Sequence, residues 1–308
     1  MNWRRCTNWA KKRPITLRLA DRLGRSRGRL NVIDRLTPPI ATRVKPCLKK
    51  WEDHDLAAIW IGHATVLLRI GGMTILTDPV LSSRVGVGFG LFTGGPRRLV
   101  APALTVRELP KIDLILISHA HFDHLDRPTL VRLPRRTPVV TARDTQDLIR
   151  DLGYRDVTEL DWGDRLEFDN GVNITAREVS HWGARTFYDM HRGFNAYLLE
   201  TPRRKVLYGG DTAYYEGFRD IGLGSRGVDL AILGIGGYDP YLAAHATPEQ
   251  AWAMADHLRA ERILPMHHST FRLSHEPVAE PMERKLQAAG RDTDRIVVRE
   301  VGGQWAMN

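Results

Sequence analysis

Cysteine is scarce in this chain, and long apolar runs are absent from it. Cys6 and Cys47 are the two cysteines among 308 residues, and two thiols cannot form a disulfide scaffold or a multi-thiolate zinc site. No stretch approaches the roughly 18 consecutive apolar residues that a membrane-spanning helix requires. Hydrophobic residues make up 43% and charged residues 26% of the chain, which is typical of a folded globular protein. We therefore exclude integral-membrane, collagen-like and coiled-coil proteins and expect a reducing cytoplasm.

Acidic residues are nearly missing from the N-terminal end. Residues 1–50 contain 15 Lys and Arg against 2 Asp and Glu, whereas the rest of the chain contains 30 against 34. This pattern predicts a basic N-terminal arm and linker over 1–50 and one folded domain over 51–308. A basic arm favours anionic surfaces, either phospholipid headgroups or nucleic acid, and a solvated leader is the alternative. Ile15–Leu23 can form a short basic amphipathic helix, which would lie on an anionic membrane surface or pack on the folded domain. We expect a cytoplasmic protein, and association with the inner face of a membrane is one alternative.

Apolar runs separated by turn residues predict an α/β fold. Val66–Ile70 and Met73–Leu76, joined by Gly71-Gly72, are typical of a hairpin. Ile112–Ile117 is continuously apolar, as in a strand buried on both faces. Further strands are expected at Ala57–Ile61, Pro138–Thr141, Val172–Val179, Ala196–Leu199, Val206–Tyr208, Val228–Leu233, Ile263–Met266 and Ile296–Val301. Helices are expected after Asp126, over Thr145–Leu152, from Thr247 to about Leu258, and over Pro277–Ala289. The mixture favours a mixed sheet, or two sheets, covered by helices.

A histidine-rich loop follows the buried strand Ile112–Ile117. Its sequence is His119-Ala120-His121-Phe122-Asp123-His124, with three histidines and a carboxylate in six residues. Imidazole nitrogen and carboxylate oxygen are ligands that a cation such as Zn²⁺ prefers. Residues two apart at a strand end can point the same way, so His119 and His121 can bind one ion, and the turn can direct Asp123 and His124 toward a second. The loop therefore predicts a metal site.

Four side chains cannot complete two metal sites, so further ligands must come from other strand ends. His181 follows an apolar run that ends at Val179, and Asp211 follows Val206–Tyr208 and two glycines. His267 and His268 follow Ile263–Met266. Each position alone is weak, because a histidine at a strand end is often an ordinary surface residue. Their shared placement after separate strands favours a common site.

The chain at this point resembles the metallo-β-lactamase superfamily. Within that superfamily it is most similar to the branch that contains N-acylphosphatidylethanolamine-hydrolysing phospholipase D and its bacterial relatives. The resemblance covers about residues 56–280. The segments that carry it are His119–His124, Trp60–Thr65, Leu76–Pro79, Ile117-Ser118, His181-Trp182, Gly210–Thr212 and His267–Phe271.

The resemblance implies a four-layer αββα sandwich with two zinc ions at one end of the strands. It places His119, His121 and His181 on one zinc, Asp123, His124 and His267 on the other, and Asp211 between them. Iron and manganese are alternatives for such His and Asp ligands. A hydroxide between the two ions would then attack a phosphoryl or carbonyl group, and Asp123 could also orient that hydroxide.

Several residues outside the metal ligands are candidates for supporting roles. His245 matches a histidine near the substrate phosphate in the family, and a core or capping histidine is the alternative. Asp78 and His63 are expected to orient metal ligands through hydrogen bonds without binding the metal themselves. Ordinary turn residues are the alternative at both positions. The residues that could bind an anionic headgroup are Arg185, His191 and Arg192, in a segment that departs from the family's usual tryptophan–glycine sequence.

These observations favour a dinuclear zinc hydrolase that acts on a lipid phosphodiester, as phospholipase D does. A lactonase of a phosphorylated sugar acid is an alternative on the same metal core. A nucleic-acid-binding protein that uses the basic arm is another, although the net-acidic remainder of the chain makes it less favoured. A purely structural zinc protein fits poorly, because such sites are usually closed and often rich in thiolates.

Overall fold

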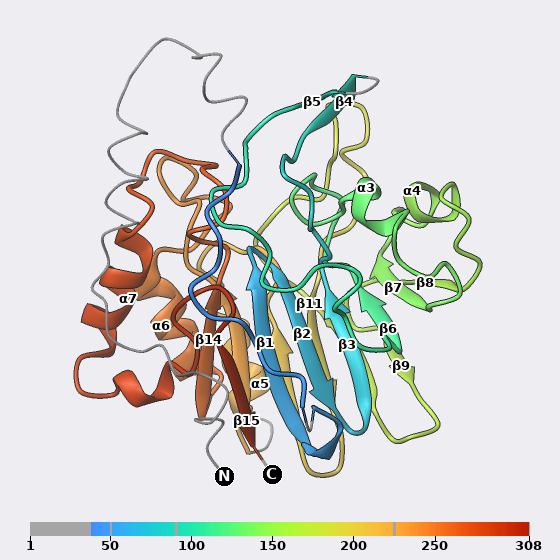
Figure 1. The fold of residues 1–308 in the computed structure, drawn as a ribbon. Helices are drawn as coiled ribbons and strands as arrows, with labels where there is room; N and C mark the ends of the chain where they lie inside the picture. The colour runs from blue at the N-terminus through green and yellow to red at the C-terminus, as the bar shows by residue number, and fades with distance from the viewer. Residues whose placement is uncertain (1–37, 50, 90–91, 224–225, 308) are drawn as a thin grey trace.

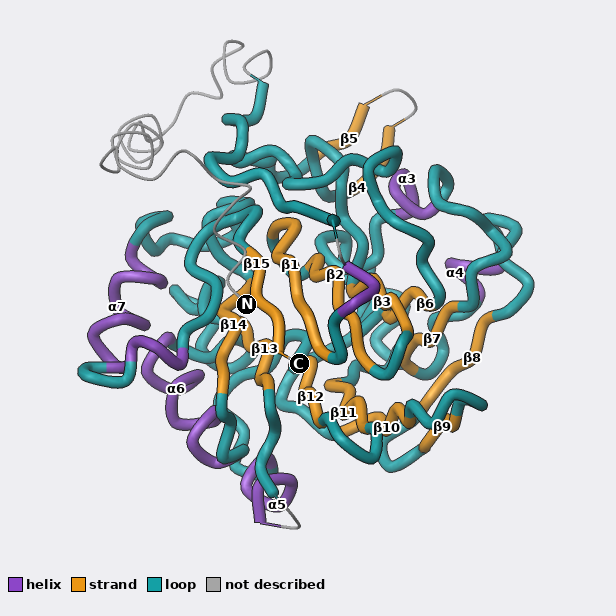
Figure 2. The backbone as a smooth tube through the Cα atoms, turned by 60° about the horizontal axis from the view of Figure 1, so that its bottom comes forward, coloured by secondary structure: helices purple, strands orange, loops and turns teal. Residues whose placement is uncertain are grey.

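The computed structural model describes residues 38–49, 51–89, 92–223 and 226–307. Its centre is a pair of mixed β-sheets that face each other (Figures 1 and 2). The first sheet has the strand order β15-β1-β2-β3-β6-β7-β8, and the second has the order β14-β13-β12-β11-β10-β9. A small hairpin, β4-β5, projects from one end (Figure 1).

The strands of the first sheet are β1 (Leu56–Gly62), β2 (Thr65–Ile70), β3 (Met73–Thr77), β6 (Leu114–Leu116), β7 (Val139–Ala142), β8 (Val157–Leu160) and β15 (Gln304–Met307). Those of the second sheet are β9 (Arg165–Glu167), β10 (Asn173–Arg177), β11 (Ala196–Glu200), β12 (Lys205–Tyr208), β13 (Leu230–Gly234) and β14 (Arg262–Met266). The hairpin comprises β4 (Val87–Phe89) and β5 (Phe92–Gly94). The helices are α3 (Arg127–Leu130), α4 (Asp147–Arg150), α5 (Phe218–Leu223), α6 (Pro248–His257) and α7 (Glu280–Ala289), with 3₁₀ turns η1 (Trp51–Asp53) and η2 (Thr293–Arg295).

Both faces of each sheet are buried, which explains the continuous apolar runs. In β1, Ala58 and Trp60 belong to the core between the sheets, whereas Ile59 and Ile61 face the outer layer. The outer core of the first sheet includes Leu130 of α3 and Ile149 of α4, and that of the second sheet includes residues of α5 and α6. This arrangement confirms the expected αββα sandwich.

The predicted hairpin at Gly71-Gly72 is confirmed, because β2 and β3 pair antiparallel with Ile70 opposite Met73. Both glycines have positive φ, 55° and 80°. A side chain on Gly71 would also collide with Val172 at 2.7 Å. Glycine therefore suits this turn for conformation and for space.

The predicted last strand, Ile296–Val301, is wrong. Only an isolated bridge forms there, between Ile263 and Ile296, although Val298 and Val301 are buried in the core. Gly302 then donates its N–H to the carbonyl of Trp60, and the chain pairs with β1 as β15. Strands β8 and β9 were not predicted, because half-exposed residues interrupt their apolar pattern.

The predicted basic arm lies mostly in residues 1–37, outside the described residues. The described segment 38–49 contacts the domain: Ile40 forms a bridge with Val100, and the amide of Cys47 donates to the Gln304 side chain at 2.7 Å. Among the described helices, none has the length and apolar character needed to cross a membrane.

Lys285, in the interface between α7 and α6, is a buried cation whose replacement should stabilise the fold. Its ammonium nitrogen has no hydrogen-bond partner among the described residues and lies 5.2 Å from the ring centroid of Trp252. Burial lowers the pKa of Lys285 from 10.5 to about 7. Lys285→Met should therefore raise the free energy of unfolding at pH 7 by about 1–4 kcal/mol, measured by urea denaturation.

The pH dependence provides the control for Lys285. Because its folded pKa is lower than its unfolded pKa, the unfolded chain binds more protons between pH 7 and 10.5. This group should make wild-type stability rise with pH across that window, and Lys285→Met should remove that contribution. A variant that is no more stable than wild type at pH 7 would contradict this account.

Candidate metal centre

The predicted site residues follow strands that end at the same edge of the sandwich. In the first sheet, β1, β3 and β6 run in the same direction, and in the second sheet β10, β12 and β14 do so. The side chains that follow these strand ends are His63, Asp78, His119 to His124, His181, Asp211 and His267. The topology thus brings together residues that are up to 204 positions apart in the sequence.

One group of possible ligands contains His119, His121, His181 and Asp211. One ligand atom from each lies within 4.8 Å of those of the others. The His121 Nδ1 atom is 2.8 Å from His119 Nε2 and 3.3 Å from His181 Nε2. The structure therefore brings together the three histidines expected around one metal ion.

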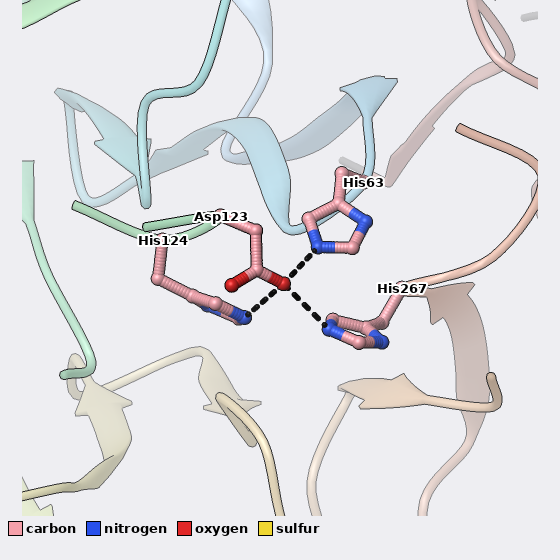
Figure 3. A group of neighbouring side chains, drawn as sticks. All are labelled: His63, Asp123, His124 and His267. Atoms are coloured by element: carbon pink, nitrogen blue, oxygen red, sulfur yellow. Dashed lines mark hydrogen bonds and ion pairs between the residues drawn. The ribbon is translucent and has the colours of Figure 1, made fainter. Parts of the chain in front are cut away.

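A second group contains His63, Asp123, His124 and His267, drawn in Figure 3. The Asp123 Oδ2 atom lies 2.8 Å from His63 Nε2. It lies 3.3 Å from His267 Nε2 and 3.7 Å from His124 Nε2. All three imidazoles thus point toward a single carboxylate oxygen (Figure 3).

Asp211 lies between the two groups. Its Oδ2 atom is 3.0 Å from His124 Nε2 and 3.1 Å from His267 Nε2 in the second group. The same atom is 3.9 Å from His181 Nε2 in the first group. This is the position expected for a carboxylate shared by two metal ions.

The orientation of the imidazole rings fits a cation site. His181 Nδ1 lies 2.9 Å from the carbonyl of Ala244, and His267 Nδ1 lies 3.2 Å from the carbonyl of Gly236. A carbonyl can only accept, so each Nδ1 carries a hydrogen, and in the neutral form of each ring Nε2 presents its lone pair to the site. Convergent lone pairs and carboxylates are the donor set that a divalent cation binds.

Opposite charges lie next to each other in the second group and at Asp211. Burial alone would raise the pKa of Asp211, but the charges of His124 and His267 outweigh it and hold this pKa well below its usual range. Burial alone would lower the pKa of His267, but Asp211 and Asp123 raise it to about 10. The same competition raises the pKa of His124 well above its usual value. In the absence of metal, therefore, each aspartate favours the protonated form of the neighbouring His124 and His267 imidazoles.

The three histidines of the first group are neutral. Burial is the main cause of low pKa values in all three. It lowers the pKa of His121 to about 4 and the pKa of His181 to about 3, and it holds the pKa of His119 well below 6.5. Neutral imidazole is the form that binds metal, so this group needs no deprotonation at pH 7.

Comparison with known proteins agrees with this geometry. A family model described as the beta-lactamase superfamily domain matches residues 73–268. The chain belongs to this superfamily. It is a metal-dependent hydrolase of the metallo-β-lactamase fold, as the sequence motifs predict.

Several relatives place it within the superfamily. An uncharacterized protein of Mycobacterium tuberculosis is 33% identical over 79% of this chain and 67% of its own length. The N-acyl-phosphatidylethanolamine-hydrolyzing phospholipase D 1 of Caenorhabditis elegans is 32% identical over 71% of this chain and 65% of its own length. A metal-dependent hydrolase of Thermoplasma acidophilum is 28% identical over 80% of this chain and 96% of its own. The chain thus spans about two thirds of the first two relatives.

A solved structure shares the fold. The isothiocyanate hydrolase from Delia radicum gut bacteria aligns with a TM-score of 0.65, at 21% identity, over 82% of this chain and 99% of that one.

The buried carboxylate of Asp78 contacts the histidine loop on the side away from the two ligand groups' shared Asp211. Its Oδ2 atom lies 2.6 Å from each of three atoms: His124 Nδ1, Ser118 Oγ and Tyr208 Oη. Its Oδ1 atom accepts the backbone N–H of Ser118 at 2.7 Å. Asp78 therefore lies where the sequence predicts it, in contact with the far nitrogen of a candidate metal ligand, His124. The roles of Ser118 and Tyr208 were not predicted, because their shared contact with Asp78 is visible only in three dimensions.

His63 belongs to the second group, where its Nε2 atom contacts Asp123 Oδ2 at 2.8 Å. Its φ is 55°, and its ring packs against His267 at 4.1 Å between centroids. The neighbouring His268 instead packs against Trp60 at 4.5 Å. Of the adjacent pair His267 and His268, the structure thus brings only His267 into the ligand groups.

The candidate substrate residues have different surroundings. His245 borders the centre, with Nδ1 3.7 Å from Asp211 Oδ2. Arg185 donates to the carbonyls of Ala120 and Leu125 at 2.9 and 2.8 Å and covers the ring of Phe122. Arg192 is buried in ion pairs, and His191 is exposed on the same loop. Arg185 and Arg192 thus make protein contacts that the sequence did not indicate.

Proposed function

We propose that this chain is a dinuclear zinc phosphodiesterase that acts on a phospholipid in the manner of phospholipase D. The observation that carries the proposal is the pair of ligand groups joined by Asp211. The similarity to the nematode phospholipase D supports the substrate class. The nitrogen and oxygen donors suit zinc, and they also suit iron and manganese.

Two sets of residues would hold the ions. His119, His121 and His181 would bind one, and Asp123, His124 and His267 the other, with Asp211 shared. Ions bound there would lower the pKa of a water molecule and polarise the phosphoryl oxygen under attack.

The protein's own side chains orient the reactants. Asp123 Oδ2 is held by His63 at 2.8 Å, so this carboxylate is fixed and can accept a proton from attacking water. Burial is the main cause that lowers the pKa of His245, so this imidazole is neutral at pH 7. With part of its ring exposed beside Asp211, it can donate one hydrogen bond to a phosphate oxygen.

The test is a substrate panel with the zinc-loaded full chain. It comprises a phospholipid with an amino-alcohol headgroup, a soluble nitrophenyl phosphodiester and a lactone of a phosphorylated sugar acid. We expect hydrolysis of both phosphodiesters, loss of this activity with a chelator, and recovery with zinc. His54→Gln, before β1, is the control and should keep full activity. Turnover of the lactone alone would overturn the phosphodiesterase in favour of a lactonase.

A further inference from the structure

Two loops beside the metal centre expose large apolar side chains to solvent. Phe187 and Tyr188 are 93% and 95% exposed, and Met190 is 60% exposed. Six of the eleven exposed large hydrophobic residues in the described part of the chain lie on these loops. We call them the rim: Trp182, Phe187, Tyr188, Met190, Tyr241 and Leu242.

Both loops are anchored at the metal centre. His181 Nδ1 contacts the carbonyl of Ala244 at 2.9 Å, which ties the loop after β10 to the loop before α6. Trp182 packs against His121 with 4.7 Å between ring centroids. Ala246 donates its N–H to the carbonyl of Thr212, next to Asp211. The rim residues therefore lie on two loops that are attached to the ligand groups.

The tip that carries Phe187 and Tyr188 is a hydrogen-bonded turn. Asp189 Oδ1 accepts the backbone N–H of Thr186 at 2.6 Å, and Asp189 Oδ2 pairs with Arg192 at 2.7 Å. Two consecutive aromatic side chains are thus held outward by polar contacts at their base. Such exposure is costly in water, and a cluster of this kind marks an interaction surface.

We propose that the rim inserts into the headgroup–acyl boundary of a phospholipid bilayer and places the metal centre against the lipid phosphates. The inference rests on the proposed phospholipid substrate. A lipid phosphodiester lies at headgroup depth with its chains in the hydrocarbon, whereas Asp211 is buried. Entry of the rim into the bilayer surface would bring the buried Asp211 to the depth of the lipid phosphates.

The chemistry of the rim favours a bilayer over a protein partner. Tyrosine and tryptophan combine an apolar ring with a polar group and concentrate at membrane interfaces. Phenylalanine, methionine and leucine supply the apolar contact. The excess of basic residues in segment 1–50 adds attraction to anionic lipid, and salt screens that attraction but not the apolar insertion.

Vesicle co-sedimentation of the zinc-loaded full chain tests the proposal. The variant is Phe187→Ser/Tyr188→Ser, and the matched control is Val131→Ser/Leu223→Ser, which removes exposed apolar residues at the end of α3 and on α5. With neutral phosphatidylcholine vesicles at high salt, the rim variant should bind at least about tenfold more weakly than wild type. The control should bind like wild type. Phosphatidylglycerol in the vesicles should strengthen binding of every form at low salt.

Hydrolysis rates on vesicle lipid and on the soluble phosphodiester distinguish a loss of membrane binding from a loss of catalysis. The rim variant should lose activity on vesicle lipid and keep it on the soluble phosphodiester. Equal vesicle binding by the rim variant and wild type, or no vesicle binding by wild type, would overturn the docking and leave the rim as a surface for a protein partner. Rim-dependent vesicle binding without phosphodiester turnover would instead overturn the proposed function and leave the docking intact.

Discussion

Replacing Asp211 with asparagine should lower kcat/KM for a phosphodiester by more than about a thousandfold and remove most of the bound metal. Asp211 is buried, and its Oδ2 atom lies 3.0 Å from His124 and 3.9 Å from His181, so one carboxylate serves both ligand groups. Asparagine keeps the size but removes the charge, and an amide is a poor shared ligand for two cations. Metal content by mass spectrometry and turnover of the soluble phosphodiester give the two readouts.

The control for Asp211 is Asp220→Asn, which changes a carboxylate on the exposed side of α5. This variant should keep the wild-type metal content and activity. If Asp211→Asn retained full metal and activity within about tenfold of wild type, Asp211 would not be the shared ligand.

The second large effect is expected for Asp78→Ala. Its carboxylate contacts His124 Nδ1, Tyr208 Oη and both polar groups of Ser118. Removal leaves several buried donors without an acceptor, which should lower the free energy of unfolding by about 3 kcal/mol or more. Because His124 also loses its orientation, zinc affinity should fall about 10- to 100-fold in a chelator competition titration.

Tyr208→Phe separates these two effects. It removes one hydroxyl from the Asp78 carboxylate and leaves the contact between Asp78 and His124 in place. Its zinc affinity should stay within a few-fold of wild type. Comparable loss of zinc affinity in both variants would show that Asp78 does not act through His124.

The candidate ligands could be identified from the sequence because their signals are local. Each lies just after an apolar run, and parallel strands bring such positions to one edge; Asp211 after β12 and His267 after β14 are examples. The histidine loop adds a pattern that chance rarely produces.

Other features depend on contacts between distant parts of the chain. The turn at His63 directs its ring to Asp123, 60 residues away. Arg185 reaches the carbonyls of the histidine loop rather than solvent. Long side chains can contact many surfaces, so their partners cannot be inferred from residue type and position alone.

The metal content of the zinc-reconstituted full chain tests the central claim most directly. After removal of loosely bound ions, mass spectrometry should find two zinc ions per chain, because two ligand groups share Asp211. One ion per chain, or none, would contradict a dinuclear centre.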